Sequence, residues 1–209
     1  MSIAADGLHL ENIHVWRGDR HVLKGLSLAV GPGDLLHVSG ANGTGKTTLL
    51  RVATGLLRAE QGNVRWRGRP ITAAAEEYQQ SLAYASHEPA LKGDLTALEN
   101  LRFLVGLRRR VRSQELRESL ERTGVAGCAD LPARVLSAGQ RRRVALARVL
   151  AVRASLWLLD EPYTNLDAAG SELMSAMLVD HVGRGGQAVV VAHHDLAVAA
   201  ATRRLELPG

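Results

Sequence analysis

Hydrophobic and polar residues alternate over two early segments of the chain, LHLENIHVW at 8–16 and VLKGLSLAV at 22–30. Such alternation is typical of strands that bury one face, and the short distance between the segments favours antiparallel pairing. The tetrapeptide GPGD at 31–34 predicts a turn. The apolar run LLHVSG at 35–40 then predicts a buried strand that leads directly into a glycine-rich segment.

Further along the chain the pattern becomes helical in two places. KTTLLRVATGLL at 46–57 predicts a first helix, and the stretch from about Thr96 to Val152 predicts several more. Between these two regions, NVRWRG at 63–68 and LAYAS at 82–86 predict short strands. A block of helices therefore interrupts a chain that is otherwise rich in strands.

Two uninterrupted apolar runs complete the pattern, SLWLLD at 155–160 and AVVVA at 188–192. Apolar runs without alternation are typical of parallel strands that helices cover on both faces. A helix predicted at about 168–183 separates the two runs, which gives a strand–helix–strand unit. The whole pattern predicts an α/β core with a helical insertion.

Composition limits the kinds of protein and partner. The chain has 209 residues, enough for one well-buried domain but short for two. Its net charge is +5, but aromatic residues make up only 3% and offer little surface for stacking bases, so we expect no nucleic-acid partner. Cys128 is the single cysteine, which excludes a disulfide framework. The sequence contains no secretory signal and no apolar run of about 20 residues, which favours a cytoplasmic location.

The segment GANGTGKTT fits the pattern of a phosphate-binding loop, because it stands between a buried strand and a helix. In such a loop, glycines let backbone N–H groups surround a β-phosphate, and the lysine reaches the β- and γ-phosphate oxygens. The threonine that follows the lysine supplies a hydroxyl ligand for Mg²⁺. The predicted loop consists of Gly40, Ala41, Asn42, Gly43, Thr44, Gly45, Lys46, Thr47 and Thr48.

Two carboxylates follow the buried strand at 155–160. Asp160 ends the strand and Glu161 comes next, at the carboxyl edge where α/β sheets bind their ligands. Phosphoryl transfer needs both a metal ion that neutralises charge and a group that orients the attacking water. We therefore expect Asp160 to hold Mg²⁺, together with Thr47, and Glu161 to act as the general base.

A second segment suited to an anion, LSAGQ at 136–140, opens a predicted helix. The N-terminus of a helix presents free N–H groups and the positive end of the helix dipole. A protein that binds one nucleotide needs only one such phosphate-facing helix. The second one therefore requires an explanation.

The order of the motifs supplies one. A phosphate loop, LSAGQ, LLDEP, NLD at 165–167 and a strand that ends in histidine together resemble the ATP-binding-cassette ATPases, over essentially the whole chain. The resemblance implies a single ATP-binding domain over residues 1–209, with the α/β fold of a P-loop NTPase. Its mostly parallel core sheet would carry an N-terminal antiparallel β subdomain, and a helical subdomain at about 96–152 would lie between the phosphate loop and the Walker B strand.

The resemblance also implies that two cassettes pack head to tail as a homodimer when ATP and Mg²⁺ are bound. The signature segment of each copy would then close over the ATP held by the other, through Ser137, Gly139 and Gln140. Asp167 would lie in the loop between the two sites. We expect His193 to be the catalytic switch histidine because AVVVA runs straight into it, with His194 as the alternative.

Three features depart from the usual family pattern. The aromatic residue that stacks on adenine is either Trp16 or absent, since the spacing also allows Arg17 at that place. His87 occupies the position where the family has the glutamine that couples the nucleotide to a membrane partner, and an imidazole is sensitive to pH where an amide is not. The arginine runs at 108–112 and 141–143 are expected to be solvated helix faces, with a lipid or partner contact as the alternative.

Finer resemblance comes from SHEP at 86–89, LTALENL at 95–101 and LSAGQRRRVALARVL at 136–150. These segments are similar to those of the ATP-binding subunits of cytochrome c maturation systems, which are described as haem exporter components. This implies that the partners are integral membrane subunits and that the cassette itself lies on the cytoplasmic face of a bacterial inner membrane. A cassette for lipid, metal or drug cargo is the alternative. A nucleic-acid-associated ATPase is disfavoured, because no long coiled coil separates the motifs.

Overall fold

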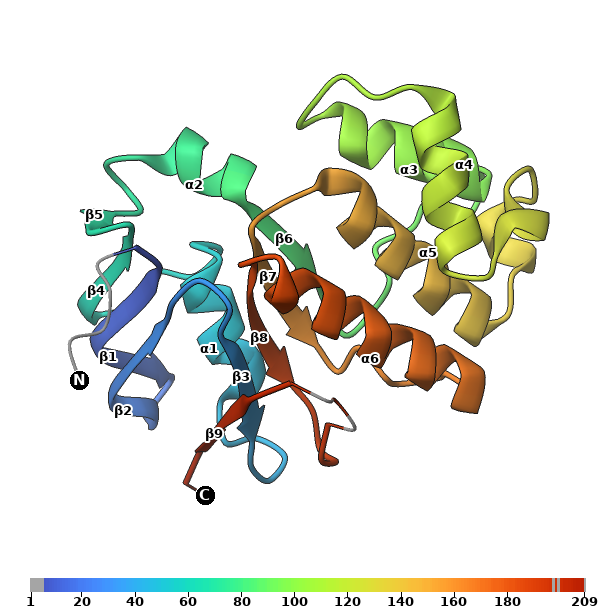
Figure 1. Cartoon of the computed structure of the whole chain (residues 1–209). Helices are drawn as coiled ribbons and strands as arrows, with labels where there is room; N and C mark the ends of the chain where they lie inside the picture. The colour runs from blue at the N-terminus through green and yellow to red at the C-terminus, as the bar shows by residue number, and fades with distance from the viewer. Residues whose placement is uncertain (1–5, 197, 199, 209) are drawn as a thin grey trace.

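The computed structural model describes residues 6–196, 198 and 200–208, which form two sheets and a block of helices (Figure 1). The antiparallel sheet has the order β2-β1-β4-β5 and the parallel sheet the order β6-β7-β8-β3-β9. The antiparallel strands are β1 (Leu8–Arg17), β2 (Arg20–Val30), β4 (Gln61–Trp66) and β5 (Arg69–Pro70). The parallel strands are β3 (Leu35–Ser39), β6 (Leu82–Ala85), β7 (Leu156–Asp160), β8 (Gln187–Val191) and β9 (Thr202–Glu206). The helices are α1 (Lys46–Ala53), α2 (Ala75–Ser81), α3 (Ala97–Gly106), α4 (Ser113–Arg122), α5 (Ala138–Val152) and α6 (Ala168–Gly183), with 3₁₀ turns at Ala126–Cys128 and Ala133–Val135.

The predicted antiparallel pair is confirmed. β1 and β2 pair antiparallel, with Leu8 opposite Val30. The predicted turn that follows closes with a hydrogen bond of 3.0 Å from the Asp34 N–H to the Gly31 carbonyl oxygen. This turn delivers the chain into β3, and β3 leads into the phosphate loop.

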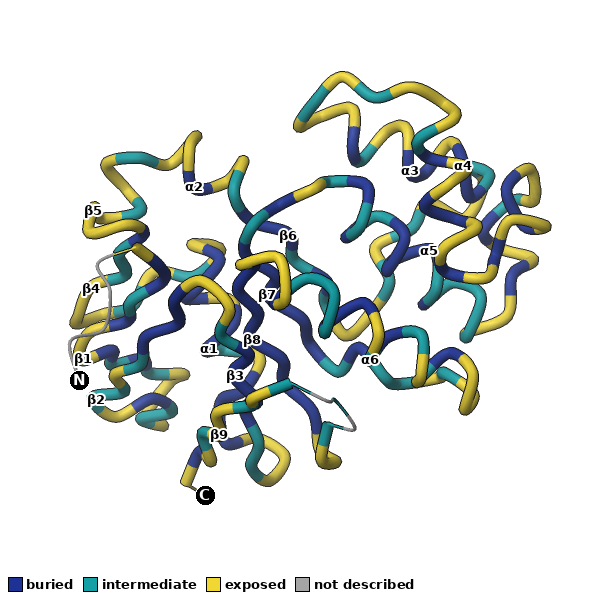
Figure 2. The backbone as a smooth tube through the Cα atoms, viewed as in Figure 1, coloured by how far each residue is buried: buried dark blue, intermediate teal, exposed yellow. Residues whose placement is uncertain are grey.

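The parallel strands β7 and β8 are buried along their whole length, as their apolar runs predicted. Alternate residues of β7 point to opposite faces of the sheet. Leu156 and Leu158 join the core shared with α1 and the antiparallel sheet, whereas Trp157 and Leu159 join the core beneath α5 and α6. In Figure 2 the tube has the dark blue of buried residues along β7 and β8.

Helix α5 connects the helical block to the sheet. Val144, Ala147 and Ala151 pack with α3 and α4, while Leu146 and Val149 pack against the parallel sheet. The helical insertion therefore has its own apolar core and shares one helix with the rest of the fold. A movement of the block relative to the sheet must involve α5.

Several details differ from the predictions. Helix α1 ends at Ala53 rather than near residue 57, because Gly55 takes a left-handed conformation with φ of 76°. Helix α2 and strand β9 were not predicted. Strand β9 lies at the sheet edge beside β3, and most of its residues are exposed or half-buried, so it lacks the apolar run that marked β7 and β8.

The prediction that the arginine runs are solvated faces is wrong for Arg142, which is buried, whereas Arg108 is exposed and Arg109 half-buried although both donate to backbone carbonyls. Arg108 donates to the carbonyl oxygens of Gln79 and Leu82, both at 2.6 Å. Arg109 donates twice to the carbonyl oxygen of Ala151, at 2.9 and 2.8 Å. Arg142 is only 1% exposed. Carbonyl groups at helix ends and sheet edges need donors, and a guanidinium offers five of them.

Candidate functional site

The phosphate loop joins the carboxyl end of β3 to α1, and its glycines adopt conformations that other residues rarely take. Gly43 and Gly45 have φ values of 80° and 103°. A Cβ atom on Gly45 would lie 2.7 Å from Cγ1 of Val22 in strand β2. The hairpin of the antiparallel sheet thus packs directly against the loop, and this close approach requires glycine at position 45.

Lys46 points back into its own loop. Its Nζ donates to the carbonyl oxygens of Gly40 at 2.7 Å and Ala41 at 3.0 Å, and the residue is 7% exposed. Thr44 stiffens the same turn through a 3.0 Å hydrogen bond from its hydroxyl to the Ala41 carbonyl oxygen. A buried ammonium requires acceptors, and the loop supplies them at the position where phosphate oxygens can take their place.

Thr47 and Asp160 meet at the carboxyl edge of the sheet. The Thr47 hydroxyl donates to Asp160 Oδ2 at 2.9 Å, and Asp160 is 1% exposed. A hydroxyl beside a carboxylate is an all-oxygen donor set, which is the kind that Mg²⁺ prefers. The residues present therefore fit this ion.

Glu161 is held in an unusual backbone conformation with φ of 50°, and its N–H donates to the Val191 carbonyl oxygen at 2.9 Å. Its Oε1 is buried and has no hydrogen-bond partner among the residues that the structure describes. His193 Nε2 lies 3.3 Å from this oxygen. A buried carboxylate oxygen without a donor is costly, so this atom is poised to accept one from a small molecule such as water.

These groups line one cavity of about 460 Å³, which we call the nucleotide cavity. The predicted residues in its lining are Asn42, Gly43, Gly45, Lys46, Thr47, Thr48, His87, Asp160, Glu161 and His193. Gly40, Ala41 and Thr44 lie behind them as the frame of the loop. Arg20, Val22 and Thr164 also line the cavity, and no sequence pattern predicted them.

Of the two candidates for the adenine contact, Arg17 lines the nucleotide cavity, whereas the Trp16 ring stacks on His21 with centroids 3.9 Å apart. Arg20 comes from the same hairpin and donates to the Gly43 carbonyl oxygen at 3.0 Å. Arg20 reaches the phosphate loop only because of where the folded hairpin lies, so no local sequence pattern predicts this contact. The cavity also distinguishes the two histidines, because His193 lines it and His194 lies in a neighbouring hollow.

The LSAGQ segment lies elsewhere, in a separate hollow of about 560 Å³ that we call the signature hollow. Ser137 caps helix α5 by accepting the Gln140 N–H at 3.1 Å, and Gln140 Oε1 accepts the Ser137 N–H at 2.8 Å. This capping box satisfies two backbone donors, so fewer N–H groups are free for an anion than the sequence suggested. A Cβ on Gly139 would lie 2.8 Å from the Asn165 carbonyl oxygen, which explains the glycine.

Asp167 lines the signature hollow rather than the nucleotide cavity. It caps α6 by accepting the Gly170 N–H at 2.9 Å and forms an ion pair with Arg143 of α5. The Gly170 N–H, followed by the Arg143 guanidinium, lowers the pKa of the Asp167 carboxyl. Within one chain the predicted residues thus fall into two groups, and the signature residues do not reach the phosphate loop.

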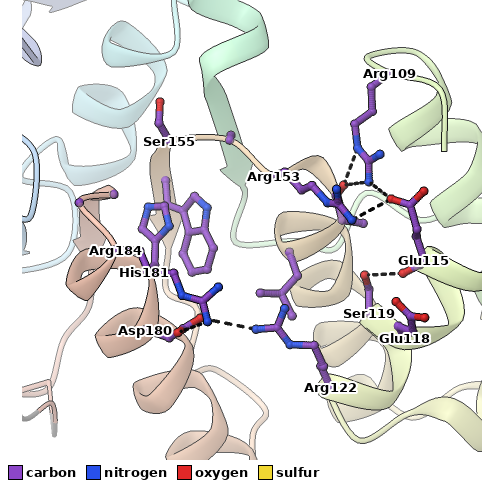
Figure 3. A pocket seen from close by; sticks show the side chains of 16 residues that line it. Arg109, Glu115, Glu118, Ser119, Arg122, Arg153, Ser155, Asp180, His181 and Arg184 are labelled. Atoms are coloured by element: carbon purple, nitrogen blue, oxygen red, sulfur yellow. Dashed lines mark hydrogen bonds and ion pairs between the residues drawn. The ribbon is translucent and has the colours of Figure 1, made fainter.

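A further hollow of about 530 Å³ lies beyond the opposite ends of the strands and contains none of the residues predicted to bind ATP or Mg²⁺ (Figure 3). Arg122 of α4 lies across it from Asp180 of α6, with 3.7 Å between the charged groups. Arg109 and Arg153 both pair with Glu115, at 3.0 and 2.9 Å. Internal ion pairs therefore occupy most of its charged groups.

One family model matches the part of the chain that contains most of these site residues. The family model described as "ABC transporter" matches residues 23–164, which include the phosphate loop, the signature segment and both carboxylates. Among characterised sequences, the chain is 46% identical to the cytochrome c biogenesis ATP-binding export protein CcmA of Methylococcus capsulatus, over 94% of this chain and 96% of that protein. It is 42% identical to the protein of the same name in Escherichia coli K12, over 91% of both chains.

Two solved structures superpose on this chain over nearly its whole length. The dimeric bacterial ABC transporter cassette MJ0796 superposes with a TM-score of 0.84 at 25% identity, covering 95% of this chain and 94% of that one. An ABC transporter ATP-binding protein from Pyrococcus furiosus, 23% identical, has the same TM-score over 97% and 98% of the two chains and supports the fold alone. No helix in the described part of the chain is both long and apolar enough to cross a bilayer.

Proposed function

The chain belongs to the ABC transporter family of ATP-binding cassettes, and from this premise we propose that it is the ATP-hydrolysing subunit of a membrane export complex that serves cytochrome c biogenesis. The observation that carries the cargo assignment is the 46% identity with a cytochrome c biogenesis ATP-binding export protein over nearly the full length of both chains. The geometry of the nucleotide cavity supports the hydrolysis.

ATP would lie with its phosphates in the loop of residues 40–48. Backbone N–H groups and Lys46 would neutralise the β- and γ-phosphates, with the ammonium exchanging the Gly40 and Ala41 carbonyls for phosphate oxygens. Thr47 and Asp160 would hold Mg²⁺, which supplies charge neutralisation at the phosphates.

Glu161 would orient the attacking water through Oε1, which accepts no hydrogen bond from the described residues although His193 Nε2 lies near it, and would accept a proton from this water. As the water oxygen bonds to the γ-phosphorus, the bond from this phosphorus to the bridging oxygen breaks, and ADP leaves with the electron pair. His193, 3.3 Å from Glu161 Oε1, would hold the carboxylate and contact the γ-phosphate.

Two copies would complete each other's sites. Ser137, Gly139 and Gln140 lie in the signature hollow, apart from the phosphate loop of their own chain, so their use on ATP requires a second copy facing the first. We propose a head-to-tail homodimer in the ATP-bound state, with Asp167 at the junction of the two sites. ATP would then form part of the interface, and hydrolysis would remove this bridge.

The work of the cycle would be done on integral membrane subunits, with the cassette docked at the cytoplasmic face of a bacterial inner membrane. Because cytochrome c carries covalently bound haem, we propose that hydrolysis powers haem export or the release of a haem-loaded chaperone. To shift the populations of a partner's two states from 1:99 to 99:1, ATP-driven closure would have to stabilise the second state by about 5.5 kcal/mol relative to the first.

The test is genetic and uses the native host. A strain whose only copy carries Glu161→Gln should lack c-type cytochromes with covalent haem while its b-type cytochromes persist, as seen by haem staining of denatured membrane and periplasmic fractions. A wild-type copy supplied in trans should restore them. Normal c-type cytochromes in the mutant would contradict the cytochrome assignment and leave a cassette for another cargo.

A further inference from the structure

Strand β6 forms one edge of the parallel sheet, so one side of its backbone has no neighbouring strand. Residues on a parallel strand direct their carbonyl groups alternately to the two sides. The carbonyl oxygens of Leu82, Tyr84 and Ser86 are the successive acceptors on one side, and none of them is left without a donor. Such an edge normally needs cover, because unpaired carbonyls are costly when buried.

Three arginines from the helical insertion supply the donors in place of a strand. Arg108 donates to the Leu82 oxygen at 2.6 Å, Arg148 to the Tyr84 oxygen at 2.7 Å, and Arg142 to the Ser86 oxygen at 2.9 Å. Arg142 and Arg148 both belong to α5, and they meet β6 in reverse order, so this helix runs antiparallel to the strand. We call the three side chains the arginine ladder.

Arg142 differs from the other two members of the ladder. Its second terminal nitrogen also donates to the His87 carbonyl oxygen, at 2.5 Å, and His87 lines the nucleotide cavity. Arg148 and Arg108 hold residues that are absent from the cavity lining. Arg142 is therefore the member of the ladder that reaches the backbone of a cavity residue.

Arg142 is buried with one of its donors unused. The residue is 1% exposed, and its Nε–H has no hydrogen-bond partner within the described residues. Burial lowers the pKa of the guanidinium, while the carboxylates of Asp160 and Glu161 raise it. A buried cation with an unused donor is retained at a cost in stability, which indicates a role beyond filling space.

The position of Arg142 on α5 indicates what that role is. Ser137 caps the start of α5 and lines the signature hollow, and Arg142 lies just over one helical turn further on. A bidentate guanidinium fixes both distance and direction, because its N–H groups form a rigid planar fork. One rigid helix thus carries the signature residues at its start and a clamp on the His87 backbone shortly after.

Resting on the ATPase function proposed above, we propose that Arg142 is a positioning residue that ties the signature helix α5 to His87, so that a shift of this helix moves His87 within the nucleotide cavity. Arg142 itself is not part of the lining of the nucleotide cavity. Its loss would leave the phosphate loop intact and would disturb the step that depends on His87.

The experiment compares Arg142→Lys with Arg148→Lys in the purified full chain. Both replace a guanidinium on the same strand edge by an ammonium, which keeps the charge but loses the fork. We expect Arg142→Lys to lower kcat about ten- to hundredfold, as a misplacement of about 1 Å can, with the Kd of a fluorescent ATP analogue unchanged. Arg148→Lys should leave kcat near the wild-type value. Hydrogen–deuterium exchange at residues 86–91 should accelerate in Arg142→Lys and not in Arg148→Lys.

A double-mutant cycle with His87→Ala separates positioning from general destabilisation. If Arg142 acts through His87, the variant with both substitutions should have the kcat of His87→Ala alone. Additive losses, or equal losses in the two arginine variants, would overturn the proposal. If the wild-type chain hydrolyses no ATP, the proposed function fails, and the exchange comparison still decides whether Arg142 holds residues 86–91.

Discussion

The hydroxyl of Thr47 donates a 2.9 Å hydrogen bond to Asp160 Oδ2 across 113 residues of sequence. The contact joins the first turn of α1 to the carboxyl end of β7 and places two oxygen donors side by side. Asp160 is 1% exposed, so its carboxylate depends on such partners.

This pair can be tested with an isosteric change. Thr47→Val keeps the shape and removes the hydroxyl, so both the ion site and the partner of Asp160 are lost. We expect kcat to fall about a hundredfold, equivalent to about 2.7 kcal/mol in the barrier, and half-maximal activity to require more Mg²⁺. Thr47→Ser restores the hydroxyl and serves as the control. ATPase assays over a magnesium titration measure both effects, and a Thr47→Val profile equal to wild type would exclude the assignment.

Glu161→Gln tests the general base. The amide has the size of the carboxylate but accepts no proton, so we expect kcat to fall about a hundred- to ten-thousandfold while ATP affinity is retained. ATP should then persist at the interface, and the variant should elute as a dimer with ATP and as a monomer without it. Size-exclusion chromatography with and without nucleotide measures this. Wild-type turnover by Glu161→Gln would assign the base elsewhere.

The parts of the site whose residues are neighbours along the chain could be predicted from the sequence. The loop at 40–48 and the Asp160–Glu161 pair are local patterns, each fixed by the strand that precedes it. Their convergence could be expected because the carboxyl ends of β3 and β7 lie on the same edge of one parallel sheet.

The residues that were missed depend on tertiary packing. Arg20 reaches Gly43 because the hairpin of β1 and β2 presses on the loop, and no local pattern encodes that contact. The charge of the arginine runs predicts exposure for all their members. Arg142 is buried instead, because the edge of β6 offers its guanidinium carbonyl acceptors, whereas Arg108 donates to the same edge and stays exposed.

His181 predicts a pH dependence of stability. The ring of His181, which is labelled in Figure 3, stacks on Trp157 with centroids 3.9 Å apart, and its Nε2 lies 3.1 Å from the Gln187 carbonyl oxygen. Burial lowers the pKa of His181, against the opposing effect of the Gln187 and Ser155 backbone and of Asp180. The fold thus favours the neutral ring. The stability this provides is present above the unfolded pKa of about 6.5 and is lost as the pH falls through the lower folded value.

His181→Phe keeps the stacked ring and removes the titration. We expect the variant to be less stable than wild type at pH 7.5, because the Gln187 carbonyl loses its partner, by about 1 kcal/mol. The difference in stability between the variant and wild type should be smaller at pH 5, because protonation of His181 destabilises only the wild-type fold. Thermal unfolding at the two pH values measures it, with the exposed His194 changed to Gln as the control. Parallel Tm losses in wild type and His181→Phe would show that another group is responsible.

The signature hollow is separate from the nucleotide cavity, so we predict that the signature residues of one chain act on the nucleotide bound by the other. A Lys46→Ala chain has an intact signature segment and a defective phosphate loop, and a Ser137→Arg chain has the reverse. Each alone should be inactive, since every site in its homodimer carries one defect. In a mixed dimer one site carries both defects and the other carries none. An equal mixture should therefore regain about a quarter of the wild-type ATPase activity if the two sites of the symmetric dimer act independently.

The mixture needs two controls, because Ser137 also caps α5 and its loss costs about 1 kcal/mol of helix stability. Circular dichroism should first show that Ser137→Arg is folded. A mixture of two differently tagged Lys46→Ala chains should then stay inactive, since no site in any of its dimers has a complete phosphate loop. If tandem affinity purification recovers mixed dimers of Lys46→Ala and Ser137→Arg that hydrolyse no ATP, the signature residues do not act on the partner's nucleotide. In that case the second helix N-terminus at Ser137 would have to be explained by its capping of α5 alone.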